Sequence, residues 1–269
     1  MTAVNGLESR CDLLRSLHRP GTPLVLPNAW DAATARAVAA AGFPAVATTS
    51  AGVAAVLGYE DHEGAPPGEM LAAAARITRS VDVPVTVDAE AGYGMTAAEL
   101  VAELRGMGAA GCNLEDTDHA AQALRDPARQ AAWLRAVRQA ASDQGYRLVI
   151  NARIDVFLPS AVSGPGGPAR GELVPEALRR AQAYLDAGAD CVYPIGLWEA
   201  DALAAFVSAC PGPVNVLRIP QAPSVAELAG LGVARVSYAS LLYRGAMEQF
   251  SRVLTPLAAE QGGRPRTGY

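Results

Sequence analysis

Residues 97–116 read AAELVAELRGMGAAGCNLED, and this stretch holds one complete unit of the pattern that decides the fold. Its first part, Ala97–Met107, is rich in alanine, is typical of a helix, and ends in the phrase GMGAAG. Glycine commonly follows the last residue of a helix because it adopts a left-handed backbone without steric cost. A short apolar run, Gly111–Leu114, comes next. The stretch therefore predicts a helix that leads directly into a strand.

The same unit recurs along the chain, and the related phrases AAGF, DAGAD and GLGVA close other helical segments. Strands are predicted at Leu24–Leu26, Ala45–Thr49, Val85–Asp88, Gly111–Leu114, Leu148–Ala152, Cys191–Tyr193, Val214–Leu217 and Arg235–Ser237. Helices are predicted between them, among others at Asp31–Ala41, Pro67–Ser80, Ala97–Met107, Pro127–Ser142 and Pro175–Ala187. Such alternation is typical of parallel strands covered by helices. Eight units favour a closed (β/α)₈ TIM barrel of the α/β class, although an open doubly wound sheet gives the same local signals.

A chain of 269 residues fits a single barrel domain, 1–269, with a core from about 22 to 255. The tail, residues 261–269, is expected to be disordered. Residues 159–171, PSAVSGPGGPARG, are too rich in glycine and proline for regular structure. Because they follow the fifth strand, they are either a lid over the catalytic face of the barrel or a solvated insertion.

Charge and hydropathy exclude several classes of partner. The net charge of −5 argues against a nucleic acid, whose phosphates need clustered positive charge. No apolar run approaches the roughly 20 residues of a membrane span. The N-terminal residues MTAVNGLESRCDLL carry charges where a signal peptide needs an apolar segment. We expect a cytoplasmic protein with neither a nucleic-acid nor a membrane partner.

The chain contains no lysine, so all 22 of its Lys and Arg residues are arginines. A Schiff-base mechanism needs an amine nucleophile, which excludes a lysine-dependent aldolase. Arginine resists deprotonation, so a general base must be a carboxylate, His, Tyr, Cys or water. The four cysteines, Cys11, Cys112, Cys191 and Cys210, form no close pair and are expected to be buried free thiols.

The third predicted strand carries two acids at its end, Asp88 and Glu90, within PVTVDAEAGYG. A spacing of two within a strand places both carboxylates on the same side. Two such acids repel each other unless a cation lies between them, and hard oxygen ligands suit Mg²⁺ or Mn²⁺. The alternative is a solvated acidic strand end. We predict a metal site at Asp88 and Glu90.

Polar residues also end the other strands, where barrel enzymes place their active sites. Small residues after the second strand, 48–52, offer hydroxyl and backbone N–H groups to an anion, or form an ordinary polar loop. The fourth strand ends in Glu115 and Asp116. Asn151 and Arg153 should share one face of the fifth strand, where Arg153 binds a substrate carboxylate or a neighbouring acid.

The three histidines are divided between the body of the chain and the predicted catalytic face. His18 precedes the barrel and is expected at the surface. His62, in GYEDHEG, and His119, in EDTDHAA, fall on loops of the catalytic face. Either one could transfer protons, and His119 is kept as a weak candidate for a catalytic residue.

These segments together resemble the isocitrate lyase / phosphoenolpyruvate mutase superfamily. The resemblance rests on LPNAWDAATARAVAAAGFPAVATTSAGVAAVLGYED, VDAEAGYG, NLED and NARIDVFL, in order, from about Leu24 to Arg244. It implies a Mg²⁺-dependent barrel that binds an α-oxo or α-hydroxy carboxylate. It further implies a homo-oligomer, a tetramer or a dimer, in which the eighth helix is exchanged between subunits.

The resemblance also implies roles for individual residues. Asp88 and Glu90 match the metal-binding acids, with Glu where a second Asp is frequent, and Glu115 matches an acid that holds metal-bound water. The remaining matches are substrate-binding positions: Thr49, Ser50 and Ala51 grip the substrate carboxylate, Arg153 binds the acid group of the substrate, and Asn215 and Arg244 correspond to further contacts. The candidate catalytic residues are Asp61, of the GYED segment, with Glu115, Arg153 and His119.

The chain departs from the superfamily in the loop after the fourth strand. Lyases carry K-[KR]-C-G-H there, and mutases and phosphonate hydrolases carry Lys and Asn, whereas this chain reads EDTDHAAQALRDPAR. After the sixth strand, VYPIGL lacks the His of mutases and the Glu of methylisocitrate lyases. The platform for a metal and an oxo acid is therefore better supported than any one reaction.

A metal-dependent carbon–carbon lyase is the function that we expect. The substrate is a small 2-oxo or 2-hydroxy di- or tricarboxylate, cleaved through a metal-stabilised enolate, as in oxaloacetate decarboxylation or in isocitrate and methylisocitrate cleavage. Decarboxylation suits a site without a cysteine acid, because loss of CO₂ needs no initial deprotonation. The alternatives are a P–C bond enzyme, similar to phosphoenolpyruvate mutase or phosphonopyruvate hydrolase, and a catalytically weak 2-oxo-acid-binding protein.

Overall fold

The computed structural model describes residues 2–158 and 168–260. Its parallel strands form a six-stranded sheet, ordered β2-β3-β4-β5-β8-β9, and a three-stranded sheet, ordered β1-β11-β10. The strand bounds are β1 Leu24–Leu26, β2 Asn28–Ala29, β3 Val46–Thr48, β4 Val85–Asp88, β5 Gly111–Glu115, β8 Val149–Ile154, β9 Cys191–Pro194, β10 Asn215–Leu217 and β11 Arg235–Ser237.

Two connections close these sheets into one ring. Only Pro27 separates β1 from β2, because proline has no N–H to donate to a neighbouring strand. A parallel bridge between Val192 and Val214 joins β9 to β10. The expected α/β barrel is confirmed, and all of its predicted strands are present to within two residues at each end.

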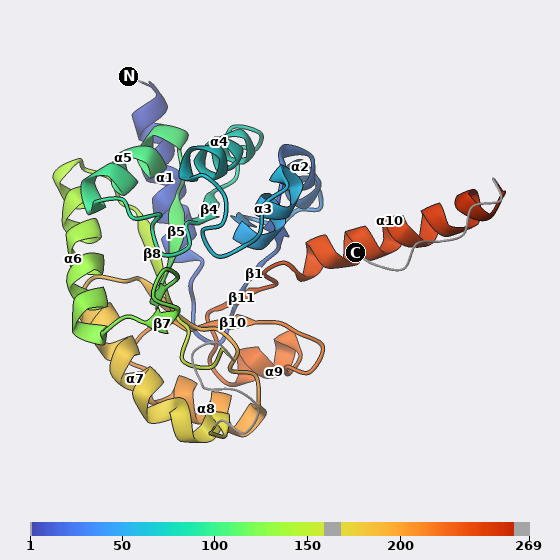
Figure 1. Ribbon diagram of the computed structural model, residues 1–269. Helices are drawn as coiled ribbons and strands as arrows, with labels where there is room; N and C mark the ends of the chain where they lie inside the picture. The colour runs from blue at the N-terminus through green and yellow to red at the C-terminus, as the bar shows by residue number, and fades with distance from the viewer. Residues whose placement is uncertain (1, 159–167, 261–269) are drawn as a thin grey trace.

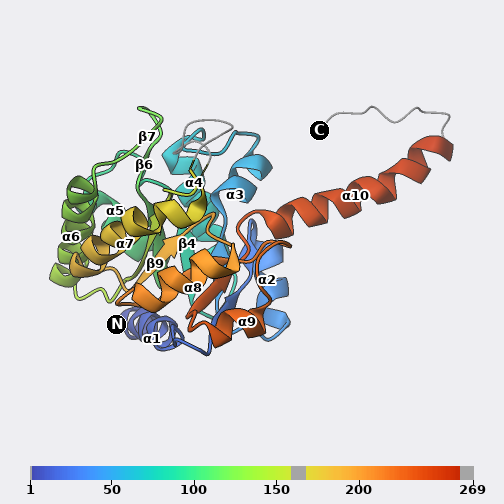
Figure 2. The ribbon, with the colours of Figure 1, turned by 90° about the horizontal axis from the view of Figure 1, so that it is seen from below.

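Helices follow the strands and cover the outside of the ring, as Figures 1 and 2 show. Their bounds are α2 Ala32–Ala40, α3 Ser50–Leu57, α4 Pro67–Thr78, α5 Ala97–Met107, α6 Pro127–Asp143, α7 Arg170–Asp186, α8 Ala200–Ala209 and α9 Val225–Gly230. A small antiparallel hairpin, β6 (Thr117–Asp118) and β7 (Ala123–Leu124), follows β5. Across the part of the chain that is described, no helix has the length and apolar character of a membrane span.

Several features depart from the sequence-based expectations. The helix α1 (Thr2–Ser16) precedes the barrel, and its Leu7, Cys11 and Leu14 join the buried core, ahead of the expected limit near residue 22. The helix α7 begins at Arg170, inside the segment 159–171 that was expected to be irregular. Residues 159–167 of that segment and the tail 261–269 lie outside the described residues.

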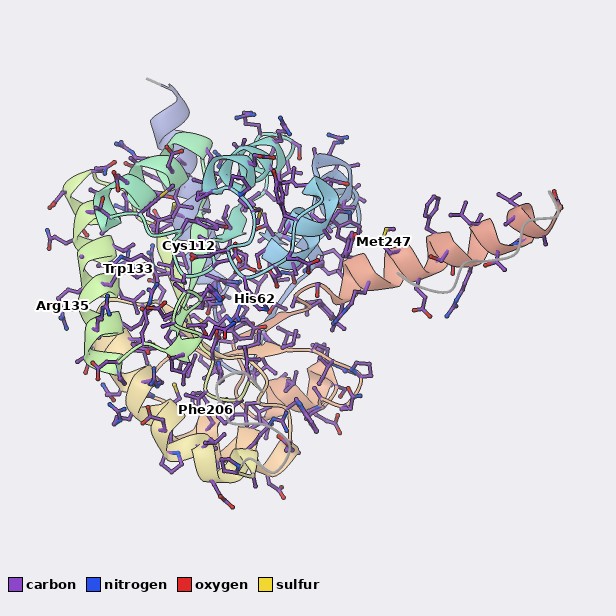
Figure 3. All side chains as sticks on the ribbon, in the orientation of Figure 1. His62, Cys112, Trp133, Arg135, Phe206 and Met247 are labelled. Carbon is purple, nitrogen blue, oxygen red and sulfur yellow. The ribbon has the colours of Figure 1, made fainter. Side chains whose placement is uncertain are left out.

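Two expectations about single side chains have different outcomes. The surface position expected for His18 is wrong, because packing between α1 and the barrel leaves that side chain only 8% exposed. The cysteines are free thiols as predicted; Cys11, Cys112 and Cys191 are buried and Cys210 is half-buried. Figure 3 shows Cys112 within the barrel body.

The last helix, α10 (Leu241–Glu260), projects away from the barrel (Figures 1 and 2). It has no buried residue. Its first turn touches the barrel through Tyr243, whose ring meets the ring of Trp30 edge-on at 5.4 Å between centroids. Figure 3 shows Met247 of α10 beyond the barrel body.

Candidate functional site

Asp88, the last residue of β4, lies at the N-terminus of α3. The backbone N–H of Ser50 donates to Asp88 Oδ2 at 3.0 Å, and the Ser50 hydroxyl donates to the same oxygen at 2.9 Å. A carboxylate is stabilised there because the first N–H groups of a helix have no partner inside the helix. The predicted metal ligand and the predicted carboxylate-binding loop thus form one site.

Glu90 lies two residues beyond the end of β4, in a left-handed backbone conformation with φ of 48°. The alternation argument for placing it beside Asp88 therefore does not apply, because it holds only within a strand. The turn nevertheless brings Glu90 close to Asp88 and Asp61. Burial, together with the charges of these acids, raises the pKa of Glu90 to about 8, although the N–H of Glu63 donates to Glu90 Oε1 at 2.6 Å.

Asp61, which follows α3, completes a group of acids that we call the acid cluster: Asp61, Asp88 and Glu90. The Oδ1 atom of Asp61 is buried and has no hydrogen-bond partner among the described residues. Within those residues, no group of three or more His, Cys, Asp or Glu side chains is arranged closely enough to hold a metal ion by itself. An oxygen-only cluster with an unpaired buried oxygen fits a hard cation such as Mg²⁺, which keeps several waters among its ligands.

Glu115, at the end of β5, is 1% exposed and forms an ion pair with Arg153 of β8. Burial raises the pKa of Glu115 to about 7, and the charge of Arg153 opposes this shift. The guanidinium of Arg153 also binds Asp155, with Nε donating to Asp155 Oδ1 at 2.6 Å. Of the two expectations for Arg153, the ion pair with neighbouring acids is confirmed, and the binding of a substrate carboxylate stays a prediction.

Asp116 directly follows β5, and its side chain contacts α7. Its Oδ2 accepts hydrogen bonds from Arg180 at 2.9 Å and from the Tyr184 hydroxyl at 2.7 Å, both on α7. Its Oδ1 accepts from the N–H of Asp155 at 2.9 Å. The two acids that end β5 are therefore separated, with Glu115 in the site and Asp116 tying β5 to α7.

His119, which directly follows β6, lies 2.5 Å from Glu115, measured from Nε2 to Oε1. Burial alone would lower the pKa of His119, but the hydrogen bond and the charge of Glu115 raise it above the usual value. The ring of His62 lies 5.3 Å from that of His119. The two candidate histidines therefore meet, although 57 positions separate 62 from 119.

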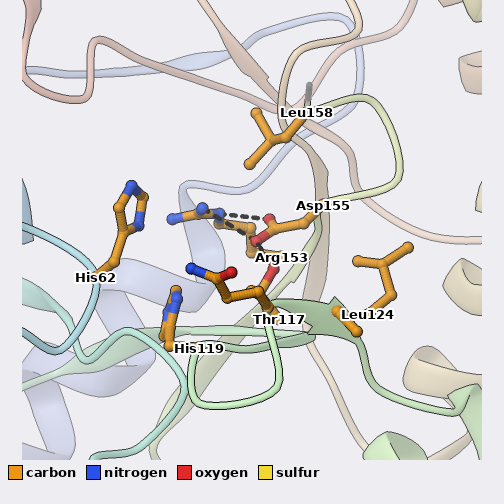
Figure 4. Close-up of a pocket in the computed structure, with 9 residues that line it drawn as sticks. His62, Thr117, His119, Leu124, Arg153, Asp155 and Leu158 are labelled. Carbon is orange, nitrogen blue, oxygen red and sulfur yellow. Dashed lines mark hydrogen bonds and ion pairs between the residues drawn. The ribbon is translucent and has the colours of Figure 1, made fainter. Parts of the chain in front are cut away.

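Both histidines line a cavity of about 450 Å³, which Figure 4 shows. His62 and His119 form one side of it, Leu158 lies on another, and Arg153 with its hydrogen-bonded partner Asp155 lies between them (Figure 4). The cavity is large enough for a small di- or tricarboxylate.

The remaining predicted site residues lie in different environments. Thr49 and Ser50 are buried at the start of α3, Ala51 is half-buried there, and the N-cap residue Thr49 makes no side-chain capping hydrogen bond. Asn215 is fully buried inside the barrel, where its Nδ2 donates to the Ser237 hydroxyl at 3.2 Å. Arg244 is exposed in α10. The substrate-binding roles of these residues remain predictions.

Two buried polar residues of this region were not singled out by the sequence analysis. Asn113 of β5 donates through Nδ2 to Asp88 Oδ1 at 3.5 Å, and its Oδ1 accepts from Arg235 of β11 at 3.1 Å. Asn113 entered that analysis only as the first residue of the segment NLED, and Arg235 only as the first residue of a strand. An arginine opening a short run that should be buried was the available signal, because a fully buried Arg is rare.

The chain is similar in sequence and in structure to known proteins. Residues 14–258 match the phosphoenolpyruvate phosphomutase family. The chain is 30% identical to 2-methylisocitrate lyase of Salmonella typhimurium over 270 residues, which covers 91% of this chain and 87% of that protein. A crystal structure from Burkholderia cenocepacia J2315, provisionally assigned as a phosphonomutase, superposes with a TM-score of 0.85 at 43% identity, covering 92% of this chain and 99% of that one. The crystal structure of 2,3-dimethylmalate lyase superposes with a TM-score of 0.81 at 25% identity, covering 94% and 86%.

Proposed function

Because the chain belongs to the phosphoenolpyruvate mutase / isocitrate lyase superfamily, we propose that it is a Mg²⁺-dependent enzyme that cleaves a C–C bond of a small 2-oxo or 2-hydroxy di- or tricarboxylate. The superfamily contains C–C lyases and enzymes of P–C chemistry. Of these two chemistries we assign C–C cleavage to this chain, and oxaloacetate-like acids are the first substrates to test.

The observation that carries the proposal is the acid cluster at the N-terminus of α3, where Asp88 accepts from the N–H and the hydroxyl of Ser50. Asp61 Oδ1 is buried without a partner, and Glu90 is buried among acids that raise its pKa to about 8. Acids gathered in this way gain stability when a divalent cation joins them. Mn²⁺ has the same preference for oxygen ligands and should replace Mg²⁺.

The cation would be held by Asp88 and Glu90, with Asp61 binding its waters. When bound, it supplies an electron-withdrawing centre that favours an enolate product of C–C cleavage. The N-terminus of α3 would bind the substrate carboxylate through the N–H of Ala51, because Thr49 makes no side-chain cap and the N–H of Ser50 already donates to Asp88. Thr49 precedes them and adds a hydroxyl.

The other end of the substrate would occupy the cavity beside Arg153 and the two histidines. Arg153 remains positively charged there, because the charges of Asp155 and Glu115 outweigh the effect of its burial and raise its pKa. His119 is our candidate for the proton donor, since its contact with Glu115 raises its pKa and favours the protonated ring. Asn215 and Arg244 are kept as weaker candidates for substrate contacts.

A panel of acids tests this proposal against its alternatives. We would incubate the full chain with Mg²⁺ or Mn²⁺ and with oxaloacetate, 2-methylisocitrate, isocitrate, 2,3-dimethylmalate, phosphonopyruvate or phosphoenolpyruvate, and then measure thermal shift and products. We expect metal-dependent turnover of a 2-oxo or 2-hydroxy acid, reduced at least about 100-fold in Asp88→Asn. Asp82→Asn is the matched control, because Asp82 is an exposed acid that precedes β4, at the opposite end of the barrel.

The outcomes separate three functions. Turnover of phosphonopyruvate or phosphoenolpyruvate alone would establish P–C chemistry, which the similarity to the Burkholderia structure supports. Stabilisation by an acid with Mg²⁺, without product, would establish a binding protein. If no acid stabilises the chain with either metal, the oxo-acid proposal is wrong.

We further propose that the chain forms a homo-oligomer, a tetramer or a dimer, in which α10 is exchanged between subunits. The apolar residues Met247, Phe250, Leu254 and Leu257 are between 44% and 55% exposed. Spacings of three and four residues place them on one face of α10. A continuous apolar face on a helix that extends away from its own barrel is expected to pack on another copy of the chain.

The oligomeric state tests this part of the proposal. Phe250→Asp should lower the mass measured by analytical ultracentrifugation, because it places a charge in the apolar face of α10. Gln249→Asp introduces the same charge away from that face and should leave the mass unchanged. A wild-type chain that sediments as a monomer at micromolar concentration would contradict helix exchange.

A further inference from the structure

Arg235, the first residue of β11, is buried inside the barrel with no exposed surface. In the ring, β11 lies opposite β5, so the contact between Arg235 Nη2 and Asn113 Oδ1 at 3.1 Å crosses the barrel interior. The Nε and Nη1 atoms of Arg235 have no hydrogen-bond partner within the described residues. The interior thus contains an arginine that is paired at only one of its nitrogen atoms.

Such a side chain is costly for the fold. Burying a charge without a partner is strongly unfavourable, and barrel interiors are normally filled by branched apolar residues. Burial lowers the pKa of Arg235, while the charge of Asp88 is among those that oppose the shift. An arginine at this position therefore needs an explanation other than packing.

The hydrogen bonds of Asn113 connect Arg235 to the acid cluster. A guanidinium only donates hydrogen bonds, so the atom of Asn113 facing it must be the amide oxygen. The same oxygen accepts from Asn151 Nδ2 at 2.9 Å. The amide nitrogen of Asn113 is then fixed toward Asp88 Oδ1 at 3.5 Å, while Ser50 donates to Asp88 Oδ2 at 3.0 and 2.9 Å. Each oxygen of the Asp88 carboxylate thereby has a hydrogen-bond donor.

We propose that Arg235 is the positioning residue and the buried counter-charge of Asp88. It fixes the orientation of the Asn113 amide, which holds the Asp88 carboxylate. Its positive charge also weakens the attraction of the acid cluster for a cation and strengthens the attraction for an anionic substrate. The effect on a cation rests on the proposed function, whereas the coupling between Arg235 and Asp88 does not.

A double-mutant cycle without metal tests the coupling. Arg235→Met, Asp88→Asn and the double variant are unfolded by urea in EDTA. Arg235→Met should fold, because replacing a buried charge by an apolar side chain of similar size is commonly tolerated. We expect the effects of the two substitutions to be non-additive by about tenfold in the unfolding equilibrium constant. Additive effects would overturn the proposal.

Two further variants address the route of the coupling and the folding of Arg235→Met. Asn113→Leu removes the connecting amide and should abolish most of the coupling between Arg235 and Asp88. Arg235→Lys keeps the positive charge and a hydrogen-bond donor, so it should retain part of the coupling to Asp88. It replaces Arg235→Met in the cycle if that variant does not fold. If Asn113→Leu leaves the coupling intact, the route through Asn113 is wrong.

The counter-charge is tested by the binding of Mn²⁺, measured by electron paramagnetic resonance on the metal-free chain. Arg235→Met should bind Mn²⁺ about tenfold more tightly than the wild-type chain, because it removes a nearby positive charge. Oxalate at saturating Mn²⁺ should then stabilise the variant less than it stabilises the wild type. A merely structural role would weaken the binding of both ions. The control, Arg36→Met, replaces an exposed arginine of α2 and should change neither.

The outcomes remain separable from the proposed function. If the wild-type chain binds no Mn²⁺, the proposed metal site is wrong, and the double-mutant cycle still decides whether Arg235 positions Asp88. If the wild type binds Mn²⁺ and Arg235→Met binds it equally or more weakly, the counter-charge role is wrong.

Discussion

Acidification should destabilise this protein through His18, which lies between α1 and β1. The side chain is 8% exposed, and its Nδ1 atom lies 2.8 Å from the carbonyl oxygen of Leu14, to which it donates. Burial lowers the pKa of His18 from 6.5 to about 4, and the nearby charge of Arg235 acts in the same direction. The hydrogen bond to Leu14 and the charge of Asp190 oppose this shift. The folded protein therefore keeps His18 neutral at pH values where the unfolded chain protonates it.

The size of the effect follows from these two pKa values. Above pH 6.5 both states contain neutral His18, and its titration does not affect stability. As the pH falls from 6.5 toward 4, the unfolded chain binds a proton that the folded chain does not, so the free energy of unfolding decreases. At pH 5 the loss relative to pH 8 is about 2 kcal/mol, from 1.36 kcal/mol per pKa unit.

Urea unfolding of the wild type and of His18→Asn at pH 8 and pH 5 measures this loss. The amide nitrogen of Asn can replace Nδ1 as a donor to Leu14, and Asn does not titrate. Other titrating groups are common to both proteins, so their contributions cancel in the difference. We expect the wild type to lose about 2 kcal/mol more than the variant between these pH values. An equal loss in both proteins would show that His18 protonates as readily in the folded state, which would refute its burial.

Two further substitutions test the packing around the site. Gly92→Ala should destabilise the fold by about 3 kcal/mol, because Gly92 has φ of 94° and an added Cβ would lie 2.6 Å from the Trp133 ring. Gly94→Ala, with φ of 66° and nothing within 4 Å of the added atom, should cost only about 1 kcal/mol; equal losses in thermal unfolding would contradict this contact. Asp116→Asn should cost about 2 kcal/mol in urea unfolding, since it removes the buried acid that pairs with Arg180 and leaves that arginine with the more exposed Glu176; a loss below 1 kcal/mol would contradict the contribution of the buried ion pair.

The barrel strands could be predicted because their signals are local. Each strand is short and apolar, and a glycine-containing helix end precedes several of them; Gly108 and Gly188 have φ of 80° and 100°. The helix α3 escaped prediction because TTSAG contains small polar residues that are equally typical of a loop. Its start is nevertheless buried, since Ser50 binds Asp88. A contact between positions 50 and 88 cannot be recognised from local sequence.

The sequence predicts most of the residues of the candidate site, but not which of them contact one another. Asp88, Glu90, Glu115 and Arg153 could be named because each lies at or just after the end of a predicted strand, whereas Asp61 was named from the GYED segment. Which acid pairs with Arg153 depends on the register between β5 and β8, where Glu115 lies opposite Arg153. The left-handed turn that carries Glu90 and the position of His62 beside His119 likewise depend on loop conformations, which the periodicity of the sequence does not encode.

The polar interior of this barrel argues that its buried polar side chains are retained for binding and not for stability. Asn113, Asn151, Asn215 and Arg235 fill positions where branched apolar side chains would pack without any cost of desolvation. Replacing buried charges by apolar residues of similar volume is often neutral or stabilising. A chain selected for stability alone would therefore lose Arg235 early. Its presence, connected to Asp88 through Asn113, is expected if the orientation and charge of that carboxylate determine what binds at the mouth of the barrel.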